Sequence, residues 1–388
     1  MPRKQALICL VAVTAVALAG CSSKKAGSSS EDGVTSTTIH LGAVSPQSGA
    51  SASFGDVTTG IKAYFDYTNA AGGINGRKID FTVLDDAYDP SKTVPQTEKL
   101  VTQDKVFAIT GNVGTKTSQA VYQRLNTEKV PSIMASGDPT MVSPILPYIF
   151  EGLAPLDADI NEQIAYVKAT YPGKKVGFLA ENNDSATNEL SLLTPAFGSL
   201  LVKQSTFLLT DPDLSSQIVA LKNAGAQVII FNGVPKYLAL AVSEARGQNW
   251  QVPFISNNAS VDSSFLSTAG AQADGVVTVT GFKTDPADPE VVKANDILKQ
   301  YAPSITPGPL SQEGLAVGQI VVAALKAAGK DLTRSSFLSA LNATNISSGV
   351  FIGQATMSPT KHNPYGCEQA LQVKSGVLAP IGDVTCGS

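Results

Sequence analysis

The chain has 388 residues, of which 43% are hydrophobic and 15% are charged, and its formal net charge is −4 at pH 7. This length exceeds what a single hydrophobic core usually supports, so we expect two domains. The acidic balance argues against nucleic acid and against anionic lipid head groups as partners.

The N-terminus has the features of an export signal. Residues 2–4 are a short positive start, and residues 6–19 form an apolar run that is shorter than the ~20 residues needed to span a bilayer. The run ends in LAGC at residues 18–21, which looks like a lipobox; a chance cysteine at an ordinary cleavage site is the alternative. We therefore expect a signal peptide at 1–20, lipid attachment at Cys21, and an extracytoplasmic protein anchored to the cell membrane.

Small polar residues follow the cysteine. The segment SSKKAGSSSEDGVTSTT offers only Val34 for burial, so we expect residues 21–38 to form a flexible tether. Residues 1–20 contain Arg3, Lys4 and no acid, so their removal leaves 26 basic and 32 acidic residues and a net charge of −6.

Two cysteines remain in the exported body. Cys367 and Cys386 lie nineteen positions apart near the C-terminus. In an exported protein such a pair is expected to form a disulfide; two free thiols are the alternative. No C-x-x-C spacing is present, so a structural role is expected in either case.

Strand-like runs then alternate with amphipathic helical patterns. The first series comprises strands at 39–44, 79–84, 106–110 and 132–135 and helices at 57–68, 92–102 and 116–126. The second comprises strands at 176–180, 205–209, 228–231 and 254–256 and helices at 160–170, 188–200, 215–224 and 236–246. Two tandem α/β units with parallel sheets follow from this order. Most of the strands end in small or polar residues, the edge at which open α/β sheets bind ligands.

The stretch NAAGGINGRKI at 69–79 makes the pattern more specific. Asn69 and the glycines after it can end a helix, and Asn75-Gly76 supplies a turn before the next strand, so its own role is predicted to be structural. Together with DDAYDP at 85–90, SGASASFG at 48–55 and the lipobox, it resembles the extracytoplasmic solute-binding proteins of branched-chain amino acid (Leu/Ile/Val) transporters. The resemblance is dense over 39–138 and collinear to the end, including a C-terminal hairpin around 374–376.

This resemblance implies a periplasmic-binding-protein-like type I fold, in which two doubly wound α/β lobes are joined by three crossovers. By position, the crossovers are expected near Ala154, Gly281 and Gly349. Lobe 1 is then expected to comprise 39–154 plus 282–349, and lobe 2 to comprise 155–281 plus 350–388.

The resemblance also implies a solute site in the first lobe. Phe54 matches an aromatic position that covers the ligand, and the loop containing Thr115, at a helix N-terminus, matches one that holds a solute carboxylate. The loop Ser136, Gly137 and Asp138 matches the second carboxylate-binding loop, although a carboxylate at Asp138 would repel that of a ligand. Thr115 as a helix N-cap, Asp138 as a turn starter and Phe54 as a core residue are the alternatives.

In the second lobe several positions depart from the family pattern. Asn257 and Asn258 stand in the loop where the family carries an acid for the ligand ammonium. Asp184 is a candidate replacement for that charge; a solvated loop residue is the alternative. Leu156 and Val234 stand near another acidic and another aromatic position. Glu313 is assigned to the favourable field at a helix start. A leucine-like ligand is therefore in question, and an amide-like or other small polar solute is an alternative.

The expected function is a substrate-binding lipoprotein that delivers its solute to the permease subunits of an ABC importer by hinge closure. A sensor that signals to a membrane partner is the alternative. Only His40 and His362 are available, so neither a metal cluster nor a histidine-based triad is predicted, and no P-loop or dinucleotide motif occurs. We expect no enzyme activity, no cofactor and a monomer.

Overall fold

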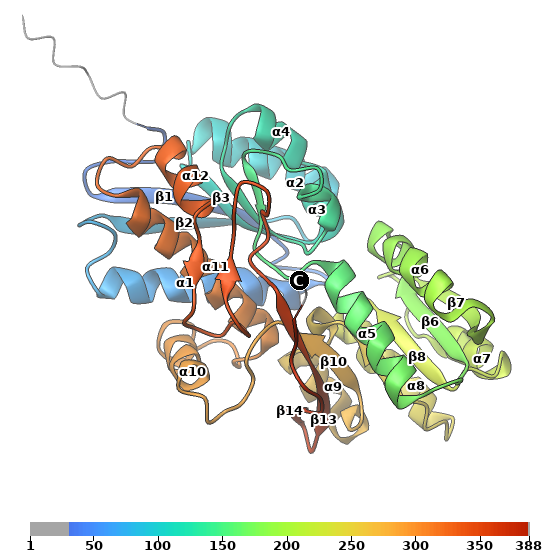
Figure 1. The fold of residues 1–388 in the computed structure, drawn as a ribbon. Coiled ribbons are helices and arrows are strands. Elements are labelled where there is room, and N and C mark those ends of the chain that lie inside the picture. Colours follow the sequence, from blue (N-terminus) through green and yellow to red (C-terminus); the bar gives the residue numbers. More distant parts are fainter. Residues whose placement is uncertain (1–30, 387–388) are drawn as a thin grey trace, which may run out of the picture. The chain divides into compact units, whose positions relative to one another are not determined.

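The computed structural model describes residues 31–386, which belong to one unit of the fold. The predicted signal peptide at 1–20 and the predicted lipidation site Cys21 lie outside the described residues. Two α/β lobes are built on two separate sheets (Figure 1). We call the part with the five-stranded sheet lobe 1 and the part with the eight-stranded sheet lobe 2.

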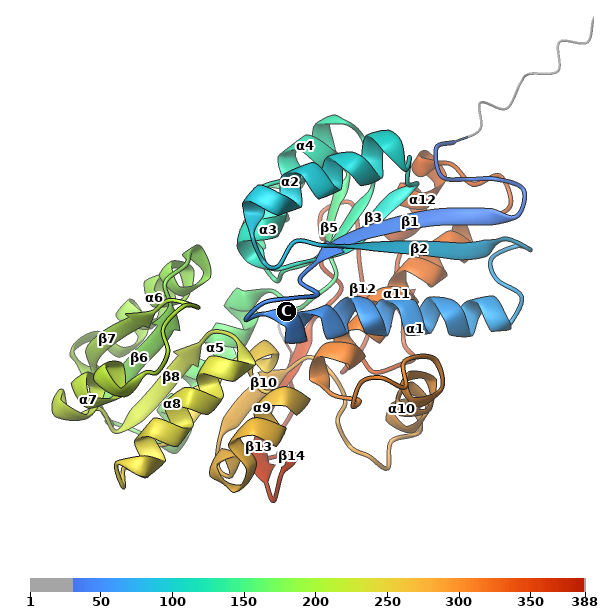
Figure 2. The same cartoon turned by 180° about the vertical axis from the view of Figure 1, so that it is seen from behind.

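Lobe 1 is built on a parallel sheet with strand order β2-β1-β3-β4-β5. Its strands are β1 (Thr38–Ser45), β2 (Lys78–Asp85), β3 (Ala108–Val113), β4 (Ser132–Ala135) and β5 (Ile149–Glu151). Its helices are α1 (Gly55–Ala70), α2 (Pro90–Glu98), α3 (Thr115–Gln119), α4 (Tyr122–Thr127), α10 (Pro289–Tyr301), α11 (Pro309–Ala328) and α12 (Arg334–Leu341). Helices α2 and α4 cover one face, and α1 and α11 cover the other (Figures 1 and 2).

Lobe 2 has strand order β14-β13-β10-β9-β8-β6-β7, with β15 paired to β13. Its strands are β6 (Val176–Glu181), β7 (Leu201–Phe207), β8 (Val228–Asn232), β9 (Phe254–Ser256), β10 (Val277–Thr280), β13 (Cys367–Lys374), β14 (Val377–Pro380) and β15 (Thr385–Cys386). Its helices are α5 (Leu156–Thr170), α6 (Asp184–Phe197), α7 (Ser215–Asn223), α8 (Pro235–Gly247) and α9 (Ser263–Ala269). Strands β6 to β10 are parallel, and the C-terminal hairpin β13–β14 is antiparallel.

Successive side chains along the strands of lobe 2 pack against two different layers of helices. Phe178 and Ile230 pack in the cluster that contains the apolar residues of α5 and α6. Their chain neighbours Leu179 and Ile229 pack in the cluster that contains residues of α7 and α8. Because successive side chains point to opposite faces, continuous apolar runs indicate strands that are covered on both sides. Figure 2 shows α8 and α9 on the face opposite α5.

Helices α1 and α11 cross at glycines. A Cβ on Gly60 would lie 2.1 Å from the carbonyl oxygen of Ser311, and a Cβ on Gly314 would lie 2.0 Å from that of Val57. Only a residue without a side chain allows this approach. The close crossing holds the N-terminal turns of both helices, which carry cavity-lining residues, against each other.

Three crossovers join the lobes, and the third lies later than the sequence indicates. Gly349 packs against Gln319 of α11, so it belongs to lobe 1. The chain then stays beside lobe 1, where the carbonyl oxygen of His362 accepts a hydrogen bond from the Glu151 amide at 2.9 Å. It enters the larger sheet at Cys367, which places this crossover at 363–366. The crossover predicted near Gly349 falls between the strands of a short pair that the sequence did not reveal, β11 (Asn345–Ile346) and β12 (Ala355–Thr356).

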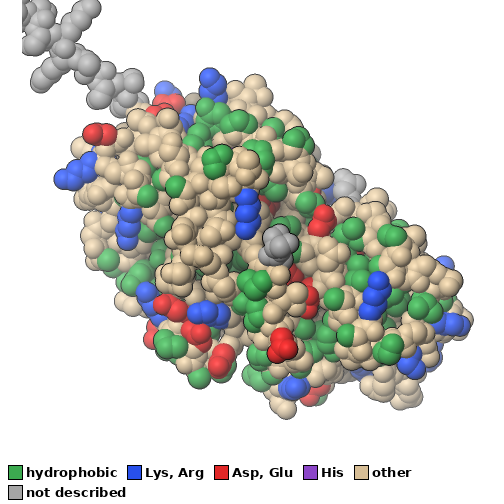
Figure 3. All heavy atoms as spheres, in the orientation of Figure 1, with side chains coloured by type: hydrophobic (Ala, Val, Ile, Leu, Met, Phe, Trp, Pro, Cys, Tyr) green, Lys and Arg blue, Asp and Glu red, His purple; other side chains and the backbone are tan. Residues whose placement is uncertain are grey.

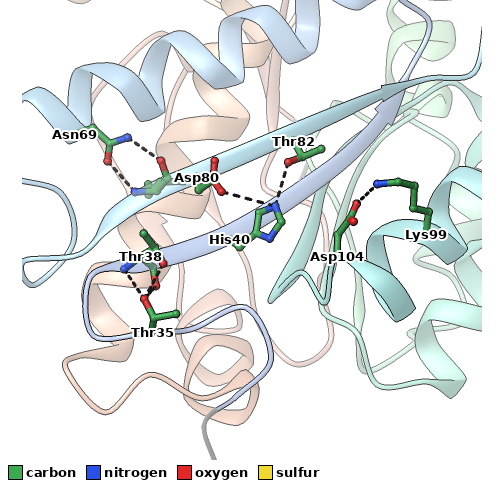
Figure 4. Close-up of polar contacts among 9 residues, drawn as sticks. Thr35, Thr38, His40, Asn69, Asp80, Thr82, Lys99 and Asp104 are labelled. Carbon is green, nitrogen blue, oxygen red and sulfur yellow. Dashed lines mark hydrogen bonds and ion pairs between the residues drawn. The ribbon is translucent and has the colours of Figure 1, made fainter.

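The stretch 69–79 forms the predicted turn. Asn69 Nδ2 donates to the carbonyl oxygen of Ile79 at 2.8 Å, and Asn69 Oδ1 accepts from the Ile79 amide at 2.8 Å (Figure 4). Asn75 and Gly76 both have positive φ. The side chain of Asn69 thus ties the end of α1 to the start of β2, and this stretch lies away from the cavity described below.

Residues 31–37, which the sequence assigns to a tether, contact lobe 1. Glu31 Oε2 accepts from the Arg334 amide at 3.2 Å, and Val34 forms an isolated bridge with Ile39. Thr35 and Thr38 are joined through their hydroxyls (Figure 4). Residues 31–37 therefore pack on lobe 1, whereas the sequence prediction includes them in a flexible segment at 21–38.

Two predicted elements differ in detail. The helix predicted at 116–126 is broken into α3 and α4, and the strand predicted at 106–110 continues to Val113.

Cys367 and Cys386 form a disulfide with an S–S distance of 2.17 Å. Within the described residues no helix has the length and apolarity to cross a bilayer. Acidic and basic side chains are interspersed on the face shown in Figure 3.

Candidate functional site: a cavity between the two sheets

A cavity of about 80 Å³ lies at the carboxyl edges of both sheets. Lobe 1 contributes residues that follow β3 and β4, and lobe 2 contributes residues at or after the ends of β6, β8 and β9. Strand order reverses in each sheet, since β2 and β3 flank β1, and β7 and β8 flank β6. Open α/β sheets bind ligands at such switch points.

Aromatic and aliphatic side chains form the lobe 1 wall. Phe54, predicted to cover the solute, lines the cavity and packs edge-to-face on Tyr88 with ring centroids 5.7 Å apart. Val57 and Val113 extend this surface. Tyr88 was not singled out from the sequence, although it lies within the DDAYDP motif. These side chains exclude water and favour an apolar part of a solute.

Thr115 also lines the cavity, as the first residue of α3. The preceding Gly114 has φ 99°, and a Cβ there would lie 2.2 Å from the Tyr88 ring, so the close fit of this loop requires glycine. Helix α3 has only five residues, and its dipole is therefore a weak attraction for an anion.

Ser136 lines the cavity, but its donors are already engaged. Its Oγ donates to Glu151 Oε2 at 2.7 Å, and its amide donates to Glu151 Oε1 at 3.1 Å. The amides of Gly152 and Leu153 donate to the same Oε1, at 2.9 and 3.2 Å. Burial raises the pKa of Glu151 to about 7, against the lowering effect of these hydrogen bonds.

The rest of this loop lies outside the cavity wall. Gly137 accepts the Leu156 amide at its carbonyl oxygen, and its Cα approaches Leu156 so closely that a Cβ would lie 3.2 Å from Leu156 Cγ. Asp138 is buried and accepts hydrogen bonds from Thr140 and, at 2.7 Å, from Gln119 Nε2. The turn-starter interpretation of Asp138 therefore describes its observed contacts, and these two residues are not part of the lining.

Lobe 2 contributes an acid and an amide at strand ends. Glu181, the last residue of β6, lines the cavity; burial raises its pKa, and Asn183 and Lys116 lower it. Asn232, the last residue of β8, lines the cavity and donates from Nδ2 to Glu189 Oε2 at 2.5 Å. Burial raises the pKa of Glu189 to about 8. Glu189 thus fixes the orientation of the Asn232 amide.

Asn257 lines the cavity, whereas Asn258 is hydrogen-bonded to a residue that lines it. Asn257 Oδ1 accepts from the amide of Ser260 at 3.1 Å. Asn258 Nδ2 donates to Oε1 of Glu313, a cavity-lining residue of α11 that is 5% exposed. Burial, with Asp262 and Glu151 nearby, raises the pKa of Glu313 to about 8. The sequence assigns Glu313 to the field at the helix start, and the structure also places it among the residues that line the cavity.

Asp184 begins α6, and its side chain lies outside the described part of the structure. Leu156 and Val234, at positions where the resemblance leads one to expect an acid and an aromatic residue, both line the cavity with aliphatic carbon. Leu153 and Leu310 add to this surface. Within residues 31–386 no cluster of three or more His, Cys, Asp or Glu side chains is arranged to hold a metal ion.

Comparisons with known proteins agree with this architecture. A family model described as "Periplasmic binding protein" matches residues 38–377. An "Amino acid binding protein" of Pseudomonas aeruginosa is 26% identical over 261 residues, which cover 66% of this chain and 68% of that protein.

Two solved structures illustrate the likeness in fold. A fatty acid ABC transporter substrate-binding protein from Thermomonospora curvata has a TM-score of 0.82 at 23% identity, covering 92% of this chain and 94% of that chain. A branched chain amino acid ABC transporter from Thermus thermophilus with bound valine has a TM-score of 0.84 at 17% identity, covering 92% and 98%. With two α/β lobes, a cavity at their switch points and a family model that matches most of its length, the chain belongs to the periplasmic binding protein family, whose members are solute-binding proteins and not enzymes.

Proposed function

We propose that this chain is the substrate-binding lipoprotein of an ABC importer. It is anchored outside the cytoplasm through lipid on Cys21, acts as a monomer, and captures a small polar solute such as an amino acid, an amide or another small organic molecule. The observation that carries the proposal is the cavity lined by both lobes. A solute there contacts both walls and so stabilises one relative arrangement of the lobes.

The proposed mechanism is closure about the three crossovers. Lys116 Nζ of lobe 1 donates to the carbonyl oxygen of Asn182 in lobe 2 at 3.4 Å, a contact across the cavity rim that an open form would lose. Hinge closure around a ligand is an established type of transition, and the closed form would present one surface made by both lobes to the permease.

A solute screen tests the function. The protein is heated with single amino acids, amides, short carboxylates, aromatic compounds and sugars, and a solute at 100 times its Kd should add about 2.7 kcal/mol to the free energy of unfolding. Small-angle scattering should show a smaller radius of gyration with the bound solute. Binding of no solute, or chemical conversion of a bound one, contradicts the proposal. Separately, Cys21→Ala should release the protein from the membrane fraction.

A further inference from the structure

The amide and hydroxyl of Ser136, which would donate hydrogen bonds to a solute carboxylate, already donate to another group of the protein. Glu151 is 1% exposed, and its Oε1 accepts the amides of Ser136, Gly152 and Leu153. Its Oε2 receives the Ser136 hydroxyl hydrogen. A solute carboxylate at this wall would therefore meet a hydroxyl with its hydrogen already donated, with a protein carboxyl directly behind it.

Carboxyl groups also line the cavity, and no basic side chain accompanies them. Glu181 and Glu313 are both lining residues, and none of the described residues lining the cavity is Lys, Arg or His. The nearby cation is Lys116, whose Nζ contacts the Asn182 carbonyl oxygen at the rim and lowers the pKa of Glu181. A purely anionic solute would therefore lie beside two acidic side chains and would have no basic partner in the cavity lining.

Glu313 has an unfilled position for a hydrogen-bond donor. Its Oε1 accepts from Asn258 Nδ2, whereas Oε2 is buried and has no hydrogen-bond partner among the described residues. The charged groups that act on Glu313, Asp262 and Glu151, are both acidic. Ionising this buried carboxyl without a cation is costly, and a bound ammonium group, which neutralises and hydrogen-bonds the carboxylate, would favour the ionised form.

We propose, on the basis of the proposed function, that the solute is a small organic ammonium ion without a carboxylate. Its charged nitrogen donates to Glu313 Oε2, with Glu181 as the second acidic group of the cavity. Its apolar body lies against the aliphatic wall that includes Val57, Val113 and Leu310. In this arrangement Thr115 and Asn257 contact uncharged parts of the solute, and neither residue is required to hold an anion.

Four compounds with related branched carbon skeletons separate charge from shape. Leucinamide and 3-methylbutylamine are cations, leucine is a zwitterion, and 4-methylpentanoate is an anion. We expect thermal-shift and calorimetric titrations of the protein to show binding of the two cations, binding of leucine at least about tenfold weaker than that of leucinamide, and no binding of 4-methylpentanoate. Tighter binding of leucine than leucinamide, or binding of 4-methylpentanoate, overturns the proposal.

The Glu313→Gln variant tests whether Glu313 is the acid that binds the ammonium group of the solute. Glutamine keeps the shape of the side chain and removes its charge, so the solute-free variant should melt at or above the wild-type temperature while leucinamide affinity falls at least about tenfold. Asp296→Asn, which removes an exposed carboxylate on α10, is the matched control and should leave the affinity unchanged. Unchanged leucinamide binding by Glu313→Gln overturns the assignment.

The result also separates this inference from the proposed function. If none of the four compounds binds, the ammonium proposal fails. The receptor function fails only if the wider solute screen also yields no ligand.

Discussion

Asn258, two residues after β9, donates its side-chain amide hydrogen to Glu313 near the start of α11, so a residue of lobe 2 is hydrogen-bonded to a residue of lobe 1 behind the cavity wall. Each partner is buried, and the contact depends on one being a donor and the other an acceptor. This hydrogen bond therefore joins the two lobes in the arrangement that the structure shows.

Asn258→Asp should weaken that arrangement in a pH-dependent way. Two carboxylates would face each other at pH 8, and the unfavourable buried charge should lower the free energy of unfolding by roughly 3 kcal/mol. At pH 5 a protonated carboxyl can again donate, so most of the loss should be recovered. Melting temperatures at the two pH values check this, with Asn223→Asp on the exposed side of α7 as control. An equal loss at both pH values would count against the pairing.

The solute-free protein should become less stable as the pH rises from about 5 to about 8. Glu189, Glu313 and Glu151 have pKa values raised from 4.5 to about 8, 8 and 7. Between the unfolded and folded pKa values the native state retains protons that the unfolded state has lost, so the free energy of unfolding falls with rising pH. Chemical denaturation at intervals of half a pH unit measures the slope.

Glu189→Gln should flatten part of that slope. The glutamine side chain does not titrate, and its carbonyl oxygen can still accept the hydrogen bond from Asn232 Nδ2. We expect the variant to gain stability relative to wild type at pH 8 and to show little difference at pH 5. Asp296→Asn should reproduce the wild-type slope, and a Glu189→Gln slope identical to wild type would contradict the role of burial.

Gly314→Ala should destabilise the crossing of α1 and α11 by about 1–3 kcal/mol or more. The added Cβ would lie 2.0 Å from the Val57 carbonyl oxygen, and the backbone there cannot move without displacing the helix. Gly247→Ala is the control, because no atom lies within 4 Å of a Cβ built at that end of α8. Urea unfolding of the two variants gives the comparison; equal stabilities would mean that the helices can separate without cost.

Reduction of the Cys367–Cys386 disulfide should lower the free energy of unfolding by roughly 3 kcal/mol. The bond closes a loop of nineteen positions, and the unfolded chain gains conformational freedom when the loop opens. The Cys367→Ser/Cys386→Ser double variant should match the reduced protein and should no longer respond to reductant. A response of the double variant to reductant would locate the effect elsewhere in the chain.

Local sequence pattern was sufficient for most of the fold. Strand β4 and the turn at 69–79 follow from short-range propensities and periodicity, and they lie where predicted. Strand β5 has only three residues and was missed, as was the pair β11–β12, because so short a segment has no measurable period. The position of the third crossover depended on that missed pair.

The cavity was harder to derive than the fold. Glu181 is the last residue of β6 and so lies at the ligand-binding edge of the sheet, whereas the sequence prediction named Asp184, three residues later. Glu313 comes from a helix that follows the second crossover, so no local pattern links it to the strand ends. Whether the Ser136 hydroxyl hydrogen is free depended on Glu151, a partner fifteen residues away. Such contacts are properties of the packed structure.

The contact of Glu31 with Arg334 sets a limit on how far the body can stand from a bilayer. If Cys21 holds the lipid, about ten residues separate the anchor from the packed chain, and their fully extended length is about 35 Å. That distance is comparable to the thickness of one bilayer and shorter than a 17-residue segment to position 38 would allow. Under the proposed function, solute capture and contact with the permease would then take place within a thin layer above the membrane surface.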